Sequence, residues 1–294
     1  MQIITPITIT DAKLVSSSLP ETDYPAWAAG TAYTVGARVG YAATHSVYQR
    51  LVAGTTPGTP DADVANWQRV GPTNRWAMFD RATGSISTST GGMTFTLSPG
   101  LIRAIALLDV TANSVTVTMT HEGLDVYRRE VSLNTGYGVN DWYTYFFSEV
   151  VLKRTLVLTD LPPYGEAEIT VTLNGTGPTG IGTVVVGGLF NLGGTRSGMQ
   201  LGMLDYSVKS TDSFGVTTLV ERAYAKRMTV PIAVLTPHVD EVARRLAQIR
   251  ATPVVWIGAS RFDQSIVYGF AKDWSIDLAY DQVSFCSLTV EGLS

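Results

Sequence analysis

The sequence is poor in cysteine and in basic charge. Its 294 residues include a single cysteine, Cys286, so no disulfide can form within the chain and stability must come from packing. Cys286 lies in an apolar run at residues 283–288, which predicts a strand with a buried, inert thiol. The 21 Lys and Arg residues are outnumbered by 25 Asp and Glu residues. Because nucleic-acid binding depends on cations that neutralise phosphates, this balance argues against a nucleic-acid partner.

Long apolar runs are also missing. No stretch approaches the ~18 consecutive apolar residues of a membrane-spanning helix, so we expect no membrane span. Residues 1–6 lack the charged and apolar segments of a signal peptide, so we expect synthesis in the cytoplasm. With 45% hydrophobic and 16% charged residues, the chain is too apolar for a disordered protein. Its length suits about two or three domains.

The sequence lacks the motifs of common catalytic and metal sites. The three histidines, His45, His121 and His238, share no motif, and neither zinc-ligand spacing, a nucleophile elbow nor a phosphate-binding loop is present. Residues 175–180 match G-x-G-x-x-G, but a strand-like run follows where a dinucleotide site requires a helix, which indicates a hairpin loop. We expect no cofactor, no metal and no catalytic residue.

Paired carboxylates leave one catalytic alternative open. A glycoside hydrolase needs two carboxyl groups across a cleft. The acidic residues that flank the β-rich region include Asp109, Glu122, Asp125 and Glu130, and nothing in their spacing marks a pair. Solvated side chains are the simpler interpretation, and a glycoside hydrolase is kept as an alternative.

The features that are present are organised around residues 71–80. Gly71 and Pro72 break regular structure, and Asn74 favours a turn. Trp76 and Phe79 follow at once, which predicts that the chain leaves one small unit here and anchors the next. We therefore divide the chain into an N-terminal β arm (1–23), a small β module (24–71), a β-sandwich (72–195) and an α+β assembly domain (196–294).

The N-terminal arm has two interpretations. Alternation at residues 7–10 predicts a short strand, and the polar run at 16–18 predicts an extended segment after it. The strand is either a terminal edge strand of the main body, which is the simpler interpretation, or part of an arm that reaches a neighbouring subunit.

The small module is rich in aromatic residues and glycine turns. The order Trp27, Tyr33, Tyr41 and Tyr48, then Trp67 after a Pro/Gly loop, resembles the chitin-binding modules of carbohydrate-binding families 5 and 12. The resemblance implies a three-stranded β module in which some rings form the core and others stack on sugar. Residues 50–58, where that family carries its stacking pair, contain no aromatic residue here. Tyr41 and Trp67 are therefore the module's candidate carbohydrate contacts, unless every ring is core.

Residues 76–195 have an all-β pattern. Period-two alternation at 115–120 and 169–173 places aliphatic side chains on a core face and threonines in water. Short strands separated by Gly, Pro and Asn predict a β-sandwich or jelly roll. The order of the pieces resembles galactose-binding-like jelly rolls. The expected fold class is thus mainly β and multidomain.

A dense aromatic cluster occupies residues 137–147. As a strand, this segment would place rings on both faces, including Trp142 and Tyr143. One face must be core, and the other either packs against a neighbouring element or subunit or contacts a ligand. Packing is the simpler interpretation, and Trp142 and Tyr143 are the second pair of candidate carbohydrate contacts.

The C-terminal region carries the clearest helix signal. Thr236 is a suitable N-cap before Pro237, and apolar residues at helical spacing in 239–249 predict one amphipathic helix. Pro231, within the preceding apolar strand, predicts a sheet edge or a bulge. Further apolar runs between residues 254 and 290 predict antiparallel strands, which makes an α+β unit with one helix.

The order of these units resembles tail-tip and baseplate proteins of tailed bacteriophages, including distal-tail-like proteins. Residues 219–224 and 250–258 contribute to the resemblance. It implies a structural virion protein, made in the host cytoplasm, that forms a trimeric or hexameric ring and contacts other tail or baseplate proteins. It also implies a module that faces neighbours or a host surface glycan. The alternatives are a carbohydrate-binding adhesin without an assembly role and a glycoside hydrolase.

Overall fold

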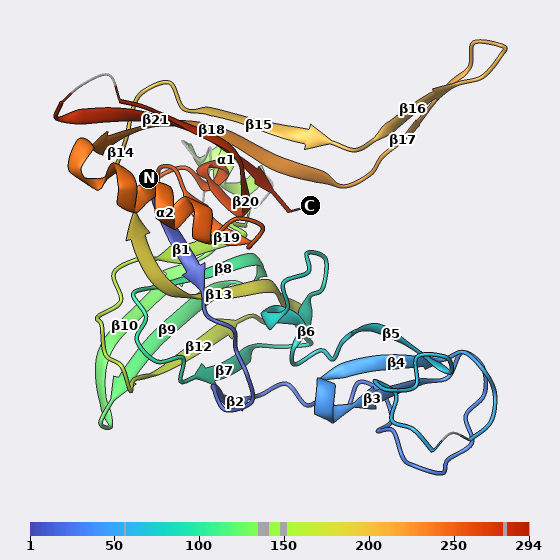
Figure 1. Ribbon diagram of the computed structural model, residues 1–294. Helices are drawn as coiled ribbons and strands as arrows, with labels where there is room; N and C mark the ends of the chain where they lie inside the picture. Colours follow the sequence, from blue (N-terminus) through green and yellow to red (C-terminus); the bar gives the residue numbers. More distant parts are fainter. Residues whose placement is uncertain (56, 135–140, 148–151, 279–280, 294) are drawn as a thin grey trace.

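The computed structural model describes residues 1–55, 57–134, 141–147, 152–278 and 281–293. The chain is mainly β, as the sequence predicts, with a sandwich body, a small module to one side and a long projecting hairpin (Figure 1). Within the described residues, the helices are all too short or too polar to cross a membrane.

One large antiparallel sheet runs through most of the molecule. Its strands lie in the order β11 (Thr155–Leu158), β8 (Ala104–Thr111), β13 (Thr179–Asn191), β1 (Gln2–Pro6), β19 (Val254–Ile257), β20 (Ile266–Asp277), β21 (Val283–Gly292), β18 (Tyr224–Leu235) and β14 (Gly194–Thr195), with β15 (Gln200–Asp205) also on β18 and β6 (Ser87–Ser89) on β13. The boundary that we place at residue 195 therefore lies within one continuous sheet.

A second sheet completes the sandwich. Its order is β10 (Leu124–Ser132), β9 (Ser114–His121), β12 (Glu168–Asn174), β7 (Met93–Leu97) and β2 (Leu14–Ser17). The alternation predicted from sequence is observed, because Val115, Val117 and Met119 are buried in the core between the sheets. The threonines lie on the other face, where Thr96 Oγ1 and Thr170 Oγ1 are 3.0 Å apart across neighbouring strands. The glycine-rich segment at 175–178 is followed by strand β13 rather than by a helix, as expected, but the predicted hairpin is wrong, because β12 and β13 belong to different sheets and the segment connects the two.

Strand β1 lies at the centre of the large sheet. It pairs with β13 along one edge and with β19 along the other. The N-terminal segment thus belongs to the main body. The edge strand expected at 7–10 lies instead at β2 (Leu14–Ser17), the edge strand of the second sheet, and the segment also supplies the central strand β1. Ile3 and Ile4 are fully buried on opposite faces, in two different core clusters. A strand that is apolar on both faces suits a central position.

The C-terminal unit packs one amphipathic helix against the large sheet. In helix α2 (Val239–Gln248), Val242 and Leu246 are buried in a core that includes Trp256. The predicted cap is wrong: a 3₁₀ turn, η3 (Thr236–His238), precedes α2, and the Thr236 hydroxyl instead meets Ser284 Oγ at 3.1 Å. Pro231 lies between the residues of β18 that pair with β14 and those that pair with β15. The ladder on that side of β18 is therefore interrupted at Pro231, in agreement with the predicted edge or bulge.

Two smaller sheets extend away from the body. The module contains β3 (Arg38–Tyr41), β4 (Ser46–Arg50) and β5 (Trp67–Pro72), which confirms the three-stranded expectation. The projecting hairpin is formed by β16 (Val208–Thr211) and β17 (Thr217–Val220) at the end of β15 and β18 (Figure 1). The short 3₁₀ helices are η1 (Ala42–Thr44), η2 (Ala77–Phe79) and η4 (Asp263–Ser265), and the other α-helix is α1 (Trp142–Phe147).

The central position of β1 predicts unequal effects for two adjacent glycines. A Cβ on Gly187 would overlap the backbone carbonyl of Thr5 in β1, whereas the nearest atom to a Cβ on Gly188 is Thr5 Oγ1 at 3.5 Å. We expect Gly187→Ala to lower the free energy of unfolding by about 3 kcal/mol, since the two backbones must move apart. Gly188→Ala, the matched control, should change it by less than about 1 kcal/mol. If chemical denaturation showed that both variants lower the free energy of unfolding equally, β1 would not lie this close to β13.

Burial predicts that Cys286 is unreactive in the native protein. The thiol is 2% exposed, and burial raises its pKa to about 11. Because the thiolate is the reactive species, maleimide labelling at pH 8 should be slow until the protein unfolds. Ser213→Cys, in the loop between β16 and β17, is the exposed control and should react at once. Fast labelling of Cys286 under native conditions would contradict the packing described for β21.

Candidate functional site

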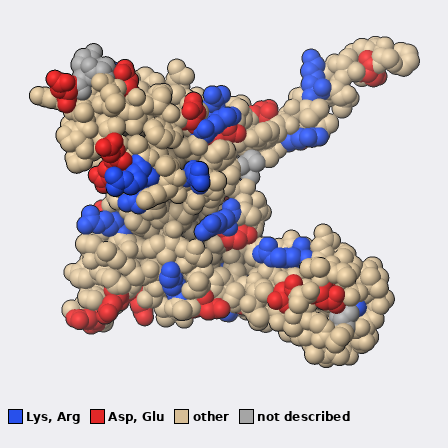
Figure 2. Space-filling view, in the orientation of Figure 1, with Lys and Arg blue, Asp and Glu red and all other residues tan. Residues whose placement is uncertain are grey.

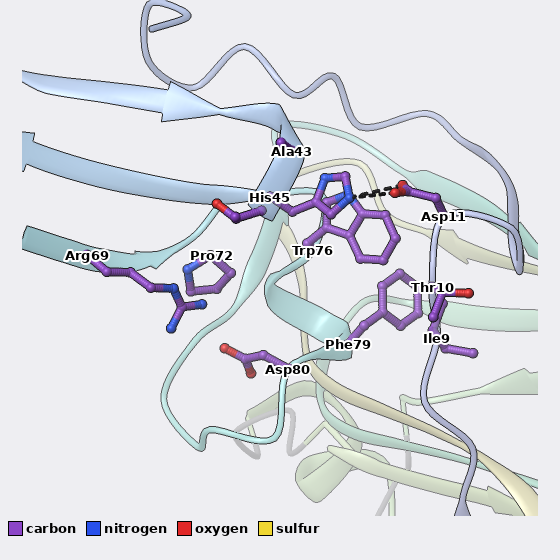
Figure 3. A pocket seen from close by; sticks show the side chains of 11 residues that line it. Ile9, Thr10, Asp11, Ala43, His45, Arg69, Pro72, Trp76, Phe79 and Asp80 are labelled. Carbon is purple, nitrogen blue, oxygen red and sulfur yellow. Dashed lines mark hydrogen bonds and ion pairs between the residues drawn. The ribbon is translucent and has the colours of Figure 1, made fainter. Parts of the chain in front are cut away.

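The joint predicted at residues 71–80 borders a pocket between the N-terminal segment, the module and the body. Its volume is about 350 Å³. Asp11 reaches it from the N-terminal segment, His45 and Arg69 from the module, and Trp76 and Asp80 from the start of the body (Figure 3). Side chains from three separate parts of the chain therefore meet at this point.

His45 is the centre of the contacts at the joint. Its Nδ1 lies 3.0 Å from Glu21 Oε1, and its Nε2 lies 3.0 Å from Asp11 Oδ1. The imidazole also stacks on the Trp76 ring, with centroids 4.0 Å apart. His45 has φ 49°, a left-handed conformation at the end of η1 that directs the chain back into β4. A neutral imidazole can donate to one of the two carboxylates, whereas the protonated form donates to both.

Further hydrogen bonds hold the same three segments together. The Thr73 hydroxyl donates to Glu21 Oε1 at 2.9 Å, and Arg75 Nε donates to the Leu19 carbonyl at 2.7 Å. The Asn74 amide exchanges two hydrogen bonds with the backbone of Thr88, both at 2.8 Å. Thr73 and Arg75, on either side of the predicted turn residue Asn74, thus bind the N-terminal segment, while the Asn74 side chain binds β6 within the body.

The contacts of this cluster suit a role in holding the three segments together rather than in transferring protons. Both ring nitrogens of His45 lie within hydrogen-bond distance of a carboxylate, so neither is left to accept a proton from a substrate. Burial raises the pKa of Asp80, although Ser85 donates to its carboxylate at 2.8 Å. Trp76 Nε1 is buried with no hydrogen-bond partner among the described residues. We therefore interpret the cluster as a structural joint.

Trp67, one candidate carbohydrate contact, is a core residue. Its side chain is 2% exposed and packs with Val39 and Tyr48. The Tyr33 ring meets it edge-on, with centroids 5.1 Å apart, and the Arg50 guanidinium lies 5.0 Å from the ring centroid. A sugar cannot stack on a ring that is enclosed in this way, so the expectation for Trp67 is wrong. A small module buries little surface, and it uses this ring to do so.

Tyr41 is half-buried and lines a second pocket, of about 210 Å³. Tyr24 and Trp27 line the same pocket, because residues 24–27 run beside β3 and Trp27 N donates to the Gly40 carbonyl at 2.9 Å. The sequence alone does not mark Tyr24 or Trp27 as contacts. Trp27 belongs to the pattern that resembles chitin-binding modules, and no sequence signal marks Tyr24, which precedes it.

Trp142 and Tyr143 lie on helix α1, so the strand predicted there is wrong over these residues; residues 137–140 lie outside the described ones. The two side chains are 78% and 72% exposed. The Tyr143 and Phe147 rings lie 4.8 Å apart, as residues four apart on a helix do. The four candidate contacts therefore do not form one site: one is core, one lines the module pocket, and two lie on α1.

The candidate carboxylates do not converge either. Asp109 lies in β8 and forms an ion pair with Arg154 at 3.3 Å. Glu122 lies in the turn between β9 and β10, in the opposite sheet, and Asp125 accepts a hydrogen bond from Thr120 there. Within the described part of the chain, no group of three or more His, Cys, Asp or Glu side chains is placed to hold a metal ion.

Comparisons with known proteins do not assign the chain to a family. No family model matches it, and no curated protein matches its sequence. Among solved structures, the F5/8 type C domain of a Bacteroides fragilis protein aligns with 37% of this chain and 77% of that chain, at 9% identity and a TM-score of 0.25. A likeness at this level carries no argument about fold or function.

The joint predicts that His45 contributes strongly to stability. We expect His45→Asn to lower the free energy of unfolding by about 2–3 kcal/mol, because the contacts of the imidazole with the Asp11 and Glu21 carboxylates and its stacking on Trp76 are lost. Asn is chosen because it tolerates the left-handed backbone at this position. His238→Asn is the control, since the His238 side chain is 60% exposed and its contact with Glu241 is 3.5 Å long. Similar thermal shifts for the two variants would show that the cluster does not hold the joint.

Proposed function

We propose that this chain is a structural component of a phage tail tip or baseplate, and that it assembles with further copies of itself. The observation that supports the proposal best is the projecting hairpin formed by β16 and β17, which we call the arm (residues 206–223). In Figure 2 the arm extends well beyond the body. The resemblance of most of the chain to tail-tip proteins suggests that it works in a phage tail, and the arm suggests how copies of it assemble.

All eight residues of β16 and β17 are exposed, on both faces of the hairpin. Val208 lies opposite Val220, and Leu219, 72% exposed, lies opposite Lys209. An isolated two-stranded hairpin is marginally stable in water, because neither face buries apolar surface. A second copy that covers the arm would supply that burial.

The tip of the arm is ordered in a way that presents one large ring. The Asp212 carboxylate accepts hydrogen bonds from the backbone N–H groups of Phe214, at 2.9 Å, and Val216, at 2.8 Å. Gly215 has φ 83°, which permits the tight turn. Phe214 is 91% exposed as a result. A preorganised aromatic side chain of this kind is typical of the residues that dominate binding energy at protein interfaces.

The outer edge of β15, beside the arm, is also suited to pairing with a strand of another copy. Strand β15 pairs with β18 on one side, and its sequence Gln-Leu-Gly-Met-Leu-Asp contains neither Pro nor Lys. Proteins that remain monomeric usually block such an edge with charge, proline or a covering element. Leu201 and Met203 in β15 are 43% and 67% exposed. These features support assembly through the same side of the molecule as the arm.

A carbohydrate-binding adhesin is the second candidate, and α1 is the observation that favours it. Trp142 and Tyr143 present large aromatic surfaces to solvent, and such surfaces stack on sugar rings. This function would not require the arm, so arm variants separate the two candidates. An adhesin would retain glycan binding after changes in the arm and lose it in Trp142→Ala.

The assembly proposal predicts that arm variants stay monomeric. In analytical ultracentrifugation, the wild-type chain should form oligomers as its concentration rises, and the double variant Phe214→Ala with Leu219→Ala should not. Because these side chains are exposed in the monomer, its thermal unfolding should shift by no more than about the ±0.5 kcal/mol typical of surface changes.

Leu124→Ala provides the matched control for the arm variant. Leu124 is 71% exposed in the β9–β10 hairpin, away from the arm, and its removal should leave the oligomers unchanged. A wild-type chain that remains monomeric at every concentration would overturn the assembly proposal. Immunogold electron microscopy of purified tailed virions then tests whether the protein lies in the tail tip. Labelling away from the tail would contradict that location.

A further inference from the structure

The aromatic pocket of the module has a composition that the resemblance to chitin-binding modules does not explain. It has a volume of about 210 Å³ and is lined by Tyr24, Trp27, Tyr41 and Glu21, with Thr73 and small residues between them. Among the described residues, Glu21 is the single charged side chain that lines it. Ligand pockets for drug-sized molecules are about 300–1,000 Å³, so this one suits a single small group rather than an oligosaccharide.

The rings are arranged as walls rather than as a platform. The Trp27 and Tyr41 rings are nearly perpendicular, at 84°, with centroids 5.6 Å apart. A sugar-binding platform needs rings in one plane, whereas a corner of perpendicular rings surrounds a compact group. Gly40, on β3, also lines the pocket and adds no side chain to the space.

The Glu21 carboxylate supplies negative charge at the side of this corner. One of its oxygens, Oε1, is used by Thr73 and His45, each within 3.0 Å. Its side chain is 16% exposed, and it lines the aromatic pocket whereas His45 lines the joint pocket. Two basic side chains lie nearby: His45, which contacts Glu21, and Arg38, whose Nη1 lies 3.4 Å from the Tyr24 hydroxyl.

We propose that this pocket binds a quaternary ammonium group, held by the Tyr24, Trp27 and Tyr41 rings and by the Glu21 carboxylate. Aromatic faces attract cations that carry little hydration, and a trimethylammonium group is both compact and poorly hydrated. The carboxylate adds a charge of opposite sign without a hydrogen-bond requirement. This site is independent of the arm, and its failure would leave the assembly proposal untouched.

The test uses choline and its uncharged isostere, 3,3-dimethyl-1-butanol. Each is titrated into the full chain at constant ionic strength, and the ¹H–¹⁵N signal of the Trp27 indole is followed by NMR. Choline should shift this signal saturably, and the isostere should bind about tenfold more weakly, because it has the same shape without the charge. Equal binding of the two, or no binding of choline at millimolar concentration, would overturn the proposal.

Two variants test the location without removing a ring. Gly40→Val fills the pocket: a Cβ at this position meets only the Tyr24 carbonyl, at 3.6 Å, so the strand accepts a side chain. Glu21→Gln removes the charge and should weaken choline binding about tenfold. Asp11→Asn is the matched control, because Asp11 contacts the same histidine but does not line this pocket. Choline binding that survives both Gly40→Val and Glu21→Gln would place the ligand elsewhere.

Phosphocholine and Nε-trimethyl-lysine then separate two sources of the same group. Arg38 shares a strand face with Gly40, two residues away, and is exposed beside Tyr24. Tighter binding of phosphocholine, lost in Arg38→Ala, would identify a phosphocholine headgroup. Tighter binding of trimethyl-lysine would identify a modified peptide. If neither exceeds the neutral isostere, the ammonium group is not what the pocket recognises.

Discussion

The pairing of β1 with both β13 and β19 is the interaction on which the rest of the structure depends. It joins strands from the two halves of the chain into one sheet, because β13 belongs to the sandwich and β19 to the C-terminal unit (Figure 1). The approach is close enough that Gly187 has no room for a side chain against Thr5. Ile3, on one face of β1, is buried in the core under α2, and Ile4, on the other face, is buried in a separate cluster with residues of β8, β13 and β19.

The joint at His45 makes the position of the module depend on the same N-terminal segment. The segment that leaves β1 supplies Asp11 and Glu21, and both meet His45 of the module. Trp76, at the start of the body, stacks against the same imidazole. The N-terminal segment therefore has two structural tasks: it completes the large sheet and then holds the module to the body. The module's aromatic pocket uses Glu21 as well, so a ligand there would touch the group that anchors the joint.

The sequence predicts those parts of the fold that depend on local periodicity. Alternation in β9 and β12, the amphipathic helix around Val242 and Leu246, and the burial of Cys286 are all observed. Two of the failures depended on contacts distant in sequence, and a third on a misleading local pattern. β1 is central because residues about 180 and 250 positions away pair with it. Trp67 is core because β3 and β4 enclose it, and Trp142 lies on a helix although its sequence alternates as a strand would. The arm had no sequence signal beyond mixed charge and scattered apolar residues.

The central proposal is that this protein acts through surfaces that are covered by other copies of the chain. The arm is the part of the molecule at which this proposal can be tested most directly. Amide hydrogen exchange, measured by mass spectrometry at rising protein concentration, reports on the arm directly. In the dilute chain, β16 and β17 should exchange rapidly, as a solvent-exposed hairpin does, while β13 stays protected. As copies associate, exchange in the arm should slow with no change in β13. Arm exchange that is equally fast at every concentration would contradict the account.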